Sequence, residues 1–143
     1  MSTETAILDQ LGRLLRQLTR LTGGADEGLS LTASQRIALV ELGQDGPLRV
    51  NDLAHRMGAS APTASRAVEA LEALGLVTRA PEPSDRRALS IGLSPKGRKL
   101  FDERLRLAVH AFRPAASALT AAERRELLQL LERMTEALRD SDG

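Results

Sequence analysis

The chain has 143 residues, with 20 Lys and Arg against 19 Asp and Glu, 42% hydrophobic residues and no cysteine. This length predicts one compact domain overall, and the absence of cysteine excludes a disulfide scaffold, a thiolate metal site and thiol redox chemistry. The longest runs without a charge, residues 57–65 and 114–122, are too short to span a membrane. No signal peptide is visible, so we expect a cytoplasmic protein.

The net charge of +1 is unevenly distributed along the chain. Residues 1–48 carry four Arg and six acidic residues (net −2), residues 49–99 carry nine basic and five acidic residues (net +4), and residues 100–143 carry seven Arg and eight acidic residues (net −1). The basic middle segment is suited to a polyanion. Aromatic side chains that stack single-stranded bases are nearly absent, so duplex is the favoured nucleic acid.

The N-terminal part predicts two helices. Apolar residues recur at spacings of three and four from Ile7 to Leu21 and form a single stripe. The segment 23–28 ends this helix and is expected to be a flexible connection. A second helix is expected to open at Thr32, because Gln35 completes a capping box, and to end at 45–47.

The middle of the chain predicts a helix-turn-helix followed by a β-hairpin. A short helix at about 50–57 ends at Gly58, and a further helix begins at Ser60 and ends at Gly75. Its expected buried positions are Ala64, Ala67, Val68, Leu71 and Leu74. Two short strands are expected at about 76–80 and 88–93, with a polar, turn-rich tip between them. This is the content of a winged helix-turn-helix.

Two more helices are expected at the C-terminal end. Ser94 and Pro95 form the N-cap and first position of one helix, which Pro114 kinks or ends. Thr120 and Glu123 open the last helix as a capping box. Apolar residues cover more than half of the last helix, namely Leu127, Leu128, Leu130, Leu131, Met134 and Leu138. So wide an apolar surface favours a homodimer, and the alternative is a bundle that closes within one chain.

Three motifs occur in order along residues 53–97. Leu-Glu-Ala-Leu-Gly-Leu-Val-Thr-Arg runs from 71 to 79, Asp85 and Arg87 follow, and Leu-Ser-Pro-Lys-Gly occupies 93–97. With Leu53-Ala54 and the segment 60–66 before them, they resemble the MarR (multiple antibiotic resistance regulator) family over about 31–100. The resemblance implies a dimeric bacterial transcription regulator, usually a repressor on a palindromic operator in double-stranded DNA, which in many members is released by a small ligand.

The predicted fold class is mainly α with a small β-hairpin wing, a winged helix-turn-helix with dimerisation helices at both ends. We expect an N-terminal dimerisation helix and connecting loop at 1–30. The DNA-binding winged helix-turn-helix module is expected at 31–93, and the C-terminal dimerisation helices at 94–143.

The helix that starts at Ser60 is the predicted recognition helix. Ser60 leaves first-turn N–H groups that can hold a phosphate, and it is also a plain helix cap. Thr63, Ser65 and Arg66 project from the first two turns. Arg66 has the reach for guanine O6 and N7, with a solvated or phosphate-contacting arginine as the alternative. Pro62 offers only an apolar contact, for example to a thymine methyl group.

Arginines at the hairpin tip and elsewhere in the basic segment supply further candidates. Arg86 and Arg87 can enter a narrow minor groove, and a solvated charge cluster is the alternative. By resemblance to the family, the carboxylate of Asp85 holds the hairpin and Arg87 reaches DNA. The candidates for contacts to the DNA backbone are Arg49, His55, Arg56 and Arg79.

A small anionic or phenolic effector is a further expectation from the family. Its pocket would lie between the DNA-binding module and the dimer helices, lined by Arg13, Arg16 and Arg20, for which salt bridges to neighbouring acids are the alternative role. Without Tyr or Trp the pocket would be aliphatic and arginine-lined, and without Cys it cannot sense peroxide through a thiol. A repressor with no ligand remains open.

No motif indicates an enzyme, a cofactor or a metal site. The segment Gly92–Gly97 does not have the spacing of a nucleophile elbow, and phosphate-binding glycine loops and dinucleotide fingerprints are absent. His55 and His110, the only histidines, lie in different modules. The alternative function is a winged-helix adaptor that binds protein and would need neither the polar face of the recognition helix nor the arginines of the wing.

Overall fold

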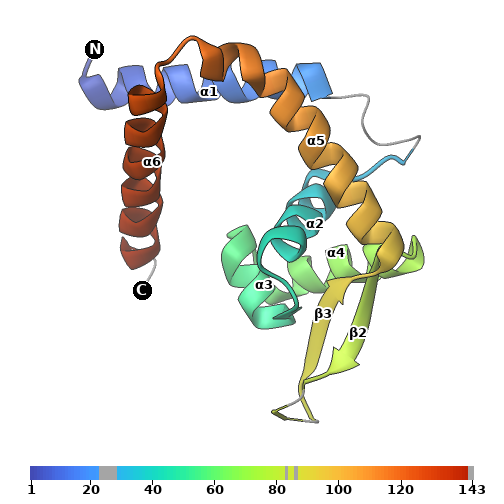
Figure 1. Ribbon diagram of the computed structural model, residues 1–143. Coiled ribbons are helices and arrows are strands. Elements are labelled where there is room, and N and C mark those ends of the chain that lie inside the picture. Colours follow the sequence, from blue (N-terminus) through green and yellow to red (C-terminus); the bar gives the residue numbers. More distant parts are fainter. Residues whose placement is uncertain (23–28, 83, 86, 142–143) are drawn as a thin grey trace. The chain divides into compact units, whose positions relative to one another are not determined.

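The computed structural model describes residues 1–22, 29–82, 84–85 and 87–141 (Figure 1). Its helices are α1 (Thr3–Thr22), α2 (Ala33–Asp45), α3 (Val50–Met57), α4 (Ala61–Ala73), α5 (Pro95–Ser117) and α6 (Ala121–Ser141). Its strands are β1 (Leu48–Arg49), β2 (Val77–Pro81) and β3 (Leu89–Leu93). The contacts divide the chain into two compact units, Thr22–Leu107 on the one hand and Met1–Leu21 with Ala108–Gly143 on the other.

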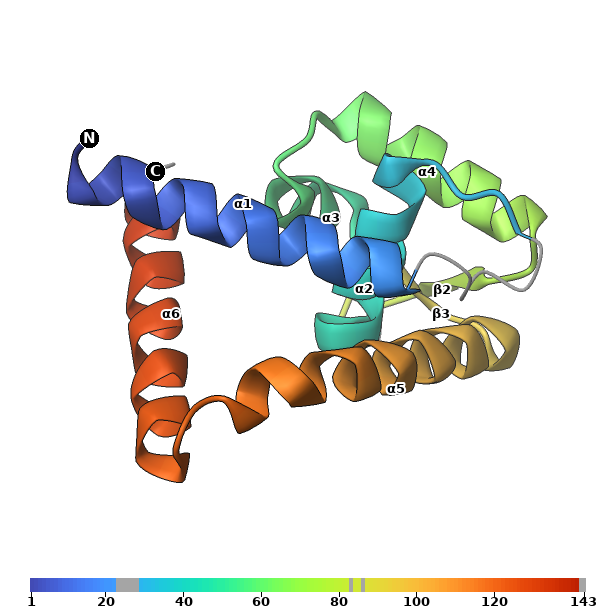
Figure 2. The same ribbon diagram turned by 90° about the horizontal axis from the view of Figure 1, so that it is seen from above.

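The unit Thr22–Leu107 is a winged helix-turn-helix. Helices α2, α3 and α4 follow one another around a common core (Figure 2). Strands β2 and β3 form the hairpin beside them (Figure 1). The sheet is antiparallel in the order β1-β3-β2, with Leu48 opposite Ile91 and Val77 opposite Leu93. The largest fully buried side chains of the unit are Leu39, Leu42, Leu53, Leu71, Leu76, Ile91 and Val68. The predicted mainly α fold with a small antiparallel sheet, a winged helix-turn-helix, is confirmed.

Local sequence signals set the helix ends of this unit. Thr32 and Gln35 form the predicted capping box at the start of α2. Gly58 adopts a left-handed conformation with φ of 66° at the end of α3, which favours glycine because a Cβ would crowd the backbone there. Gly75 does the same with φ of 75° just beyond α4. Four of the five predicted buried positions of α4 are buried, whereas Leu74 is only half-buried.

The structure adds detail to the sequence-based expectations at three places. It contains β1, a strand of two residues that is too short to leave a periodic signal in the sequence. Pro114 does not end α5, which continues to Ser117. Residues 94–107, expected with the dimerisation helices, cluster with the winged helix-turn-helix, because the first turns of α5 pack against that unit.

The other unit consists of α1, the last part of α5, and α6. The predicted capping box of α6 is present, since the Thr120 N–H donates to Glu123 Oε1 at 2.8 Å and the Glu123 N–H donates to Thr120 Oγ1 at 3.1 Å. Arg124 Nη1 donates to the carbonyl oxygens of Ala116 and Leu119 and so caps the end of α5.

Neither α1 nor α6 buries a single residue in this chain. Most of their large apolar side chains are exposed instead, including Leu8 at 72% and Leu138 at 71%. This is the amphipathic pattern that the sequence predicts, but without a core that covers it. Among the described residues, no helix is long and apolar enough to cross a lipid bilayer.

Candidate nucleic-acid interface

The N-terminus of α4 is organised by Ser60. Its Oγ accepts the N–H of Thr63 at 3.2 Å and donates to Thr63 Oγ1 at 2.9 Å. Pro62 has no N–H, so among the first three residues of α4 only Ala61 keeps an N–H that this cap does not use. The geometry therefore shows Ser60 as a helix cap that also orients the Thr63 hydroxyl, with little of the first turn left for a phosphate.

Helix α4 has a buried side and an exposed side. Ala64, Ala67 and Val68 are buried in the core, and on the other side Arg66 is exposed and Ser65 is half-buried. In the described part of the chain, the Arg66 guanidinium has no hydrogen bond and no ion pair. The buried side of α4 holds the backbone of Arg66 in place, while its guanidinium is in water. Such a guanidinium can bond base edges or phosphates.

Asp85 shapes the tip of the wing through the backbone. Its Oδ1 accepts the N–H of Arg87 at 3.0 Å, and its carbonyl oxygen accepts the N–H of Ala88 at 3.1 Å. The N–H of Glu82 donates to the carbonyl oxygen of Ala88 at 2.9 Å, which closes the hairpin. Arg87 is exposed, while Arg86, the other predicted arginine of the tip, lies outside the described residues.

Three of the predicted backbone contacts are arginines that already hold carboxylates. Arg56 Nη1 lies 2.8 Å from Asp45 Oδ2, and Arg79 Nε lies 3.5 Å from Glu72 Oε2, whereas His55 is exposed. All these groups are partly solvated, so the pairs contribute little to stability but lower the positive potential that DNA would meet.

Arg49 forms the third pair, which joins β1 to the base of the wing. Its Nη2 lies 3.3 Å from Glu82 Oε2, and this hydrogen bond together with the charge of Glu82 raises the pKa of Arg49 above its ordinary value. Ser84 Oγ donates to the same oxygen at 3.4 Å. Glu82 could not be predicted as a site residue from the sequence, because its partner Arg49 is 33 residues away in the chain.

Comparison with known proteins identifies this architecture. A model described as the MarR family matches residues 28–88. The solved structure of a probable transcriptional regulator from Pseudomonas aeruginosa is 36% identical, covers 90% of this chain and 98% of its own, and has a TM-score of 0.56. The chain belongs to the MarR family. Regulators of this family bind DNA and act as dimers.

Two other relatives have more specific descriptions. The HTH-type transcriptional repressor NicR of Pseudomonas putida is 29% identical over 140 residues, which are 95% of this chain and 89% of NicR. The structure of S. aureus MepR bound to ethidium bromide has a TM-score of 0.64 and 25% identity, and the match covers 91% of this chain and 95% of MepR. The relatives that are named as regulators or repressors of transcription, NicR among them, are not enzymes. Within the described residues, no group of three or more His, Asp or Glu could hold a metal ion.

Two of the three arginines predicted to line an effector pocket of this MarR-family chain bond side chains of their own helix. Arg13 Nε lies 3.0 Å from Asp9 Oδ2, and Arg20 donates to Gln17 Oε1. Arg13, Arg16 and Arg20 are all exposed. For Arg13 this is the salt-bridge role named as the alternative, and an effector site at these residues stays a prediction.

Proposed function

We propose that this chain is a homodimeric transcriptional repressor that binds a palindromic operator in double-stranded DNA. Helix α4 enters the major groove with Thr63, Ser65 and Arg66, and the β2–β3 hairpin brings Arg87 to the adjacent minor groove. The family places the chain among DNA-binding transcriptional regulators. The repressor role is supported by the likeness to NicR. The predicted cytoplasmic location and the lack of enzymatic activity belong to the same proposal.

The observation that carries the proposal is the contrast between the paired and the unpaired arginines. Arg49, Arg56 and Arg79 are each held by a carboxylate. In the described part of the winged helix-turn-helix, Arg66 and Arg87 have no such side-chain partner. These two sit on the elements that a winged helix brings to the major and minor grooves. A protein-binding adaptor would have no use for a cation kept available at both places.

The homodimer is supported by the unpartnered faces of α1 and α6. Two helices of 20 and 21 residues without one buried residue leave a large apolar area in water. Burying it against a second copy would recover roughly 25 cal/mol for each Å² removed from water. A two-fold dimer would also present two α4 helices to the two halves of a palindrome.

Release of the chain from DNA by a small ligand is the last part of the proposal. It is supported by the family resemblance and by the solved complex of MepR with ethidium bromide. Ethidium is a cation, however, and the arginines of α1 would favour an anion. The chemical class of the effector is therefore left to screening, in which thermal stabilisation and loss of DNA binding by the same compound identify the ligand.

The proposal is tested by binding to fluorescent duplexes drawn from a random-sequence pool. We expect binding that weakens steeply with salt, and enrichment of a palindromic sequence over successive rounds of selection. Footprinting the enriched duplex then gives the spacing of its half-sites. Lack of any duplex binding at 50 mM salt would instead favour the adaptor that binds protein.

A further inference from the structure

The chain leaving the recognition helix is held by the first turn of α5. The carbonyl oxygen of Leu74 accepts Lys96 Nζ at 3.0 Å, that of Gly75 accepts Ser94 Oγ at 2.6 Å, and that of Leu76 accepts the N–H of Ser94 at 3.0 Å. Three consecutive carbonyl groups directly after α4 are thus bonded by Ser94, which precedes α5, and by Lys96 in the first turn of α5. We call Ser94, Lys96 and Gly97, with the three carbonyl groups they meet, the α4–α5 joint.

Two details show that the joint is closely packed. Ser94 Oγ donates to the carbonyl oxygen of Gly75 and accepts the N–H of Gly97 at 3.0 Å. One hydroxyl therefore bonds both the chain that leaves α4 and the first turn of α5. A Cβ placed on Gly97 would lie 1.9 Å from the carbonyl oxygen of Leu76, so the two backbones are as close as they can be. Ser94 and Gly97 are buried.

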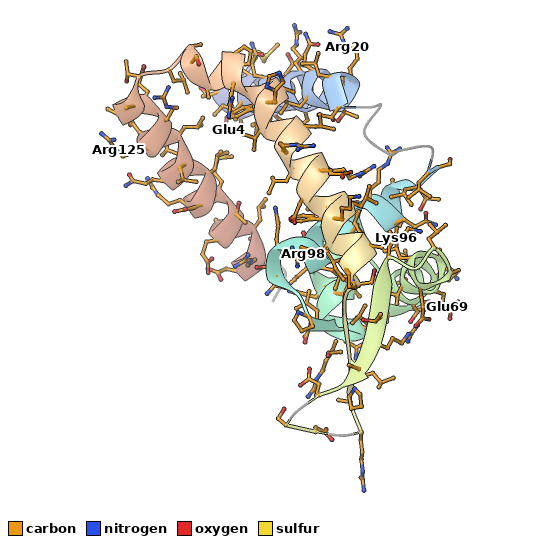
Figure 3. All side chains as sticks on the ribbon, turned by 45° about the vertical axis from the view of Figure 1, so that its right-hand side comes forward. Glu4, Arg20, Glu69, Lys96, Arg98 and Arg125 are labelled. Carbon is orange, nitrogen blue, oxygen red and sulfur yellow. The ribbon has the colours of Figure 1, made fainter. Side chains whose placement is uncertain are left out.

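The following turn of α5 is bonded to α2 through Arg98 and packs against it through Phe101. Arg98 Nη1 donates to the carbonyl oxygen of Gly43 at 3.1 Å, and its guanidinium lies 5.4 Å from the centre of the Phe101 ring. Phe101 in turn fills the space where Gly43 lacks a side chain, since a Cβ there would lie 2.3 Å from the ring. Figure 3 shows Lys96 and Arg98 on the first turns of α5. The start of α5 is therefore fixed both to α2 and to the end of α4.

We infer that Lys96 is a positioning residue for sequence recognition by this chain, an inference that rests on the proposed DNA binding. Its ammonium bonds the last carbonyl group of α4, at the negative end of the helix, and so fixes the angle at which Arg66 is presented. Lys96 itself need not touch DNA. A small rotation about the C-terminal end of α4 displaces the reading side chains at its N-terminal end, because a helix of 13 residues is about 20 Å long.

The test compares Lys96→Met with Lys99→Met, which removes the same charge three residues further along α5. Both lysines are exposed, but in the described structure only Lys96 bonds the carbonyl group of Leu74. Two duplexes of equal length serve as probes, the sequence enriched by the wild-type chain and an unselected random sequence. We expect Lys96→Met to lose about tenfold in affinity for the enriched duplex relative to Lys99→Met, and to match it on the random duplex. Lys96→Arg, which keeps a donor, should restore most of the loss.

A second measurement follows the joint itself. Amide hydrogen exchange at Gly75 and Leu76 should be faster in Lys96→Met than in Lys99→Met, with unchanged exchange in α6. Such a result, together with the selective loss of affinity, supports the positioning role. Equal affinities of Lys96→Met and Lys99→Met for both duplexes would overturn it.

Two other results would also overturn the inference. An equal loss on both duplexes, with a salt slope lower by about one than that of Lys99→Met, would make Lys96 a phosphate contact. If Lys96→Met has a lower melting temperature but the same ratio of affinities for the enriched and the random duplex as Lys99→Met, the role of Lys96 is purely structural. Failure of the wild-type chain to enrich any sequence would overturn the proposed function and this inference together, whereas enrichment by the wild type with no effect of Lys96→Met overturns the inference alone.

Discussion

The carboxylate of Asp85 accepts the backbone N–H of Arg87 at 3.0 Å, and the described structure shows no contact between that carboxylate and the Arg87 guanidinium. Asp85 and Arg87, to which the family resemblance gives paired roles, are thus joined through the main chain of Arg87. The acidic group shapes the turn, and the basic group remains available to a ligand. The two side chains are therefore expected to have separable effects.

Removing the guanidinium should affect DNA binding without affecting the turn. In Arg87→Ala we expect weaker binding and a salt slope lower by about one, because one phosphate-directed cation is lost. The salt dependence of duplex affinity measures this. Asp85→Asn keeps an oxygen that can accept the Arg87 N–H, so it should retain the wild-type melting temperature, and a marked loss of stability in Asp85→Asn would contradict the role of the turn.

The exposed arginine of α4 should set base preference. Arg66→Ala is expected to cost about 1–3 kcal/mol on the preferred duplex and to relax the choice of base at one position in each half-site. Arg79→Ala is the matched control, because it removes the same charge from an arginine that is paired with Glu72. Selection from a random pool with each variant is the measurement, and equal relaxation in both would contradict direct readout by Arg66.

The apolar face of α6 should hold two copies together. We expect the wild-type chain to have twice the mass of its 15.4 kDa monomer in light scattering at micromolar concentration. Leu131→Asp places a charge on the apolar face and should yield monomers. Gln129→Asp adds the same charge about 200° around the helix and should leave the dimer intact. A monomeric wild type would contradict the proposed dimer.

The start of α6 should lose stability in acid. Hydrogen bonds from the N–H and hydroxyl of Thr120 lower the pKa of Glu123 below its ordinary value of 4.5. Since the folded-state pKa is the lower one, the stabilisation is complete above pH 4.5 and is lost as the pH falls through the folded-state pKa. The difference in melting temperature between wild type and Glu123→Gln, which keeps the capping box but does not titrate, should therefore shrink in acid. A constant difference from pH 7 to pH 3 would contradict this.

The close approach at Gly97 should tolerate no side chain. Gly97→Ala forces a Cβ against the carbonyl oxygen of Leu76, so we expect a loss of about 1–3 kcal/mol in the free energy of unfolding. Gly92→Ala is the control, because its Cβ would lie 3.5 Å from Pro47 Cβ, an ordinary contact. Chemical denaturation of both variants measures the difference, and similar losses would show that the backbone can relax at Gly97.

Local features of this fold could be predicted wherever the interaction lies within a few residues of sequence. The predicted helix ends depend on contacts between residues at most four apart. These ends are the capping boxes at Thr32 and Thr120, the N-caps at Ser60 and Ser94, and the helix stop at Gly58. The buried positions of α4 follow from a period that the sequence displays directly. The family resemblance rests on such local motifs, which is why the sequence alone displays it.

The sequence alone determined the order of the helices and the hairpin and the basic character of the middle segment, and it supplied the candidate residues for contact with DNA. It could not determine which of those arginines are available, because Glu82 pairs with Arg49 across 33 residues and Asp45 with Arg56 across 11. Nor could it show that Lys96 meets the end of α4, 22 residues earlier. Such pairs depend on the packing of whole elements against one another, and only the tertiary structure decides which charges are left for a ligand.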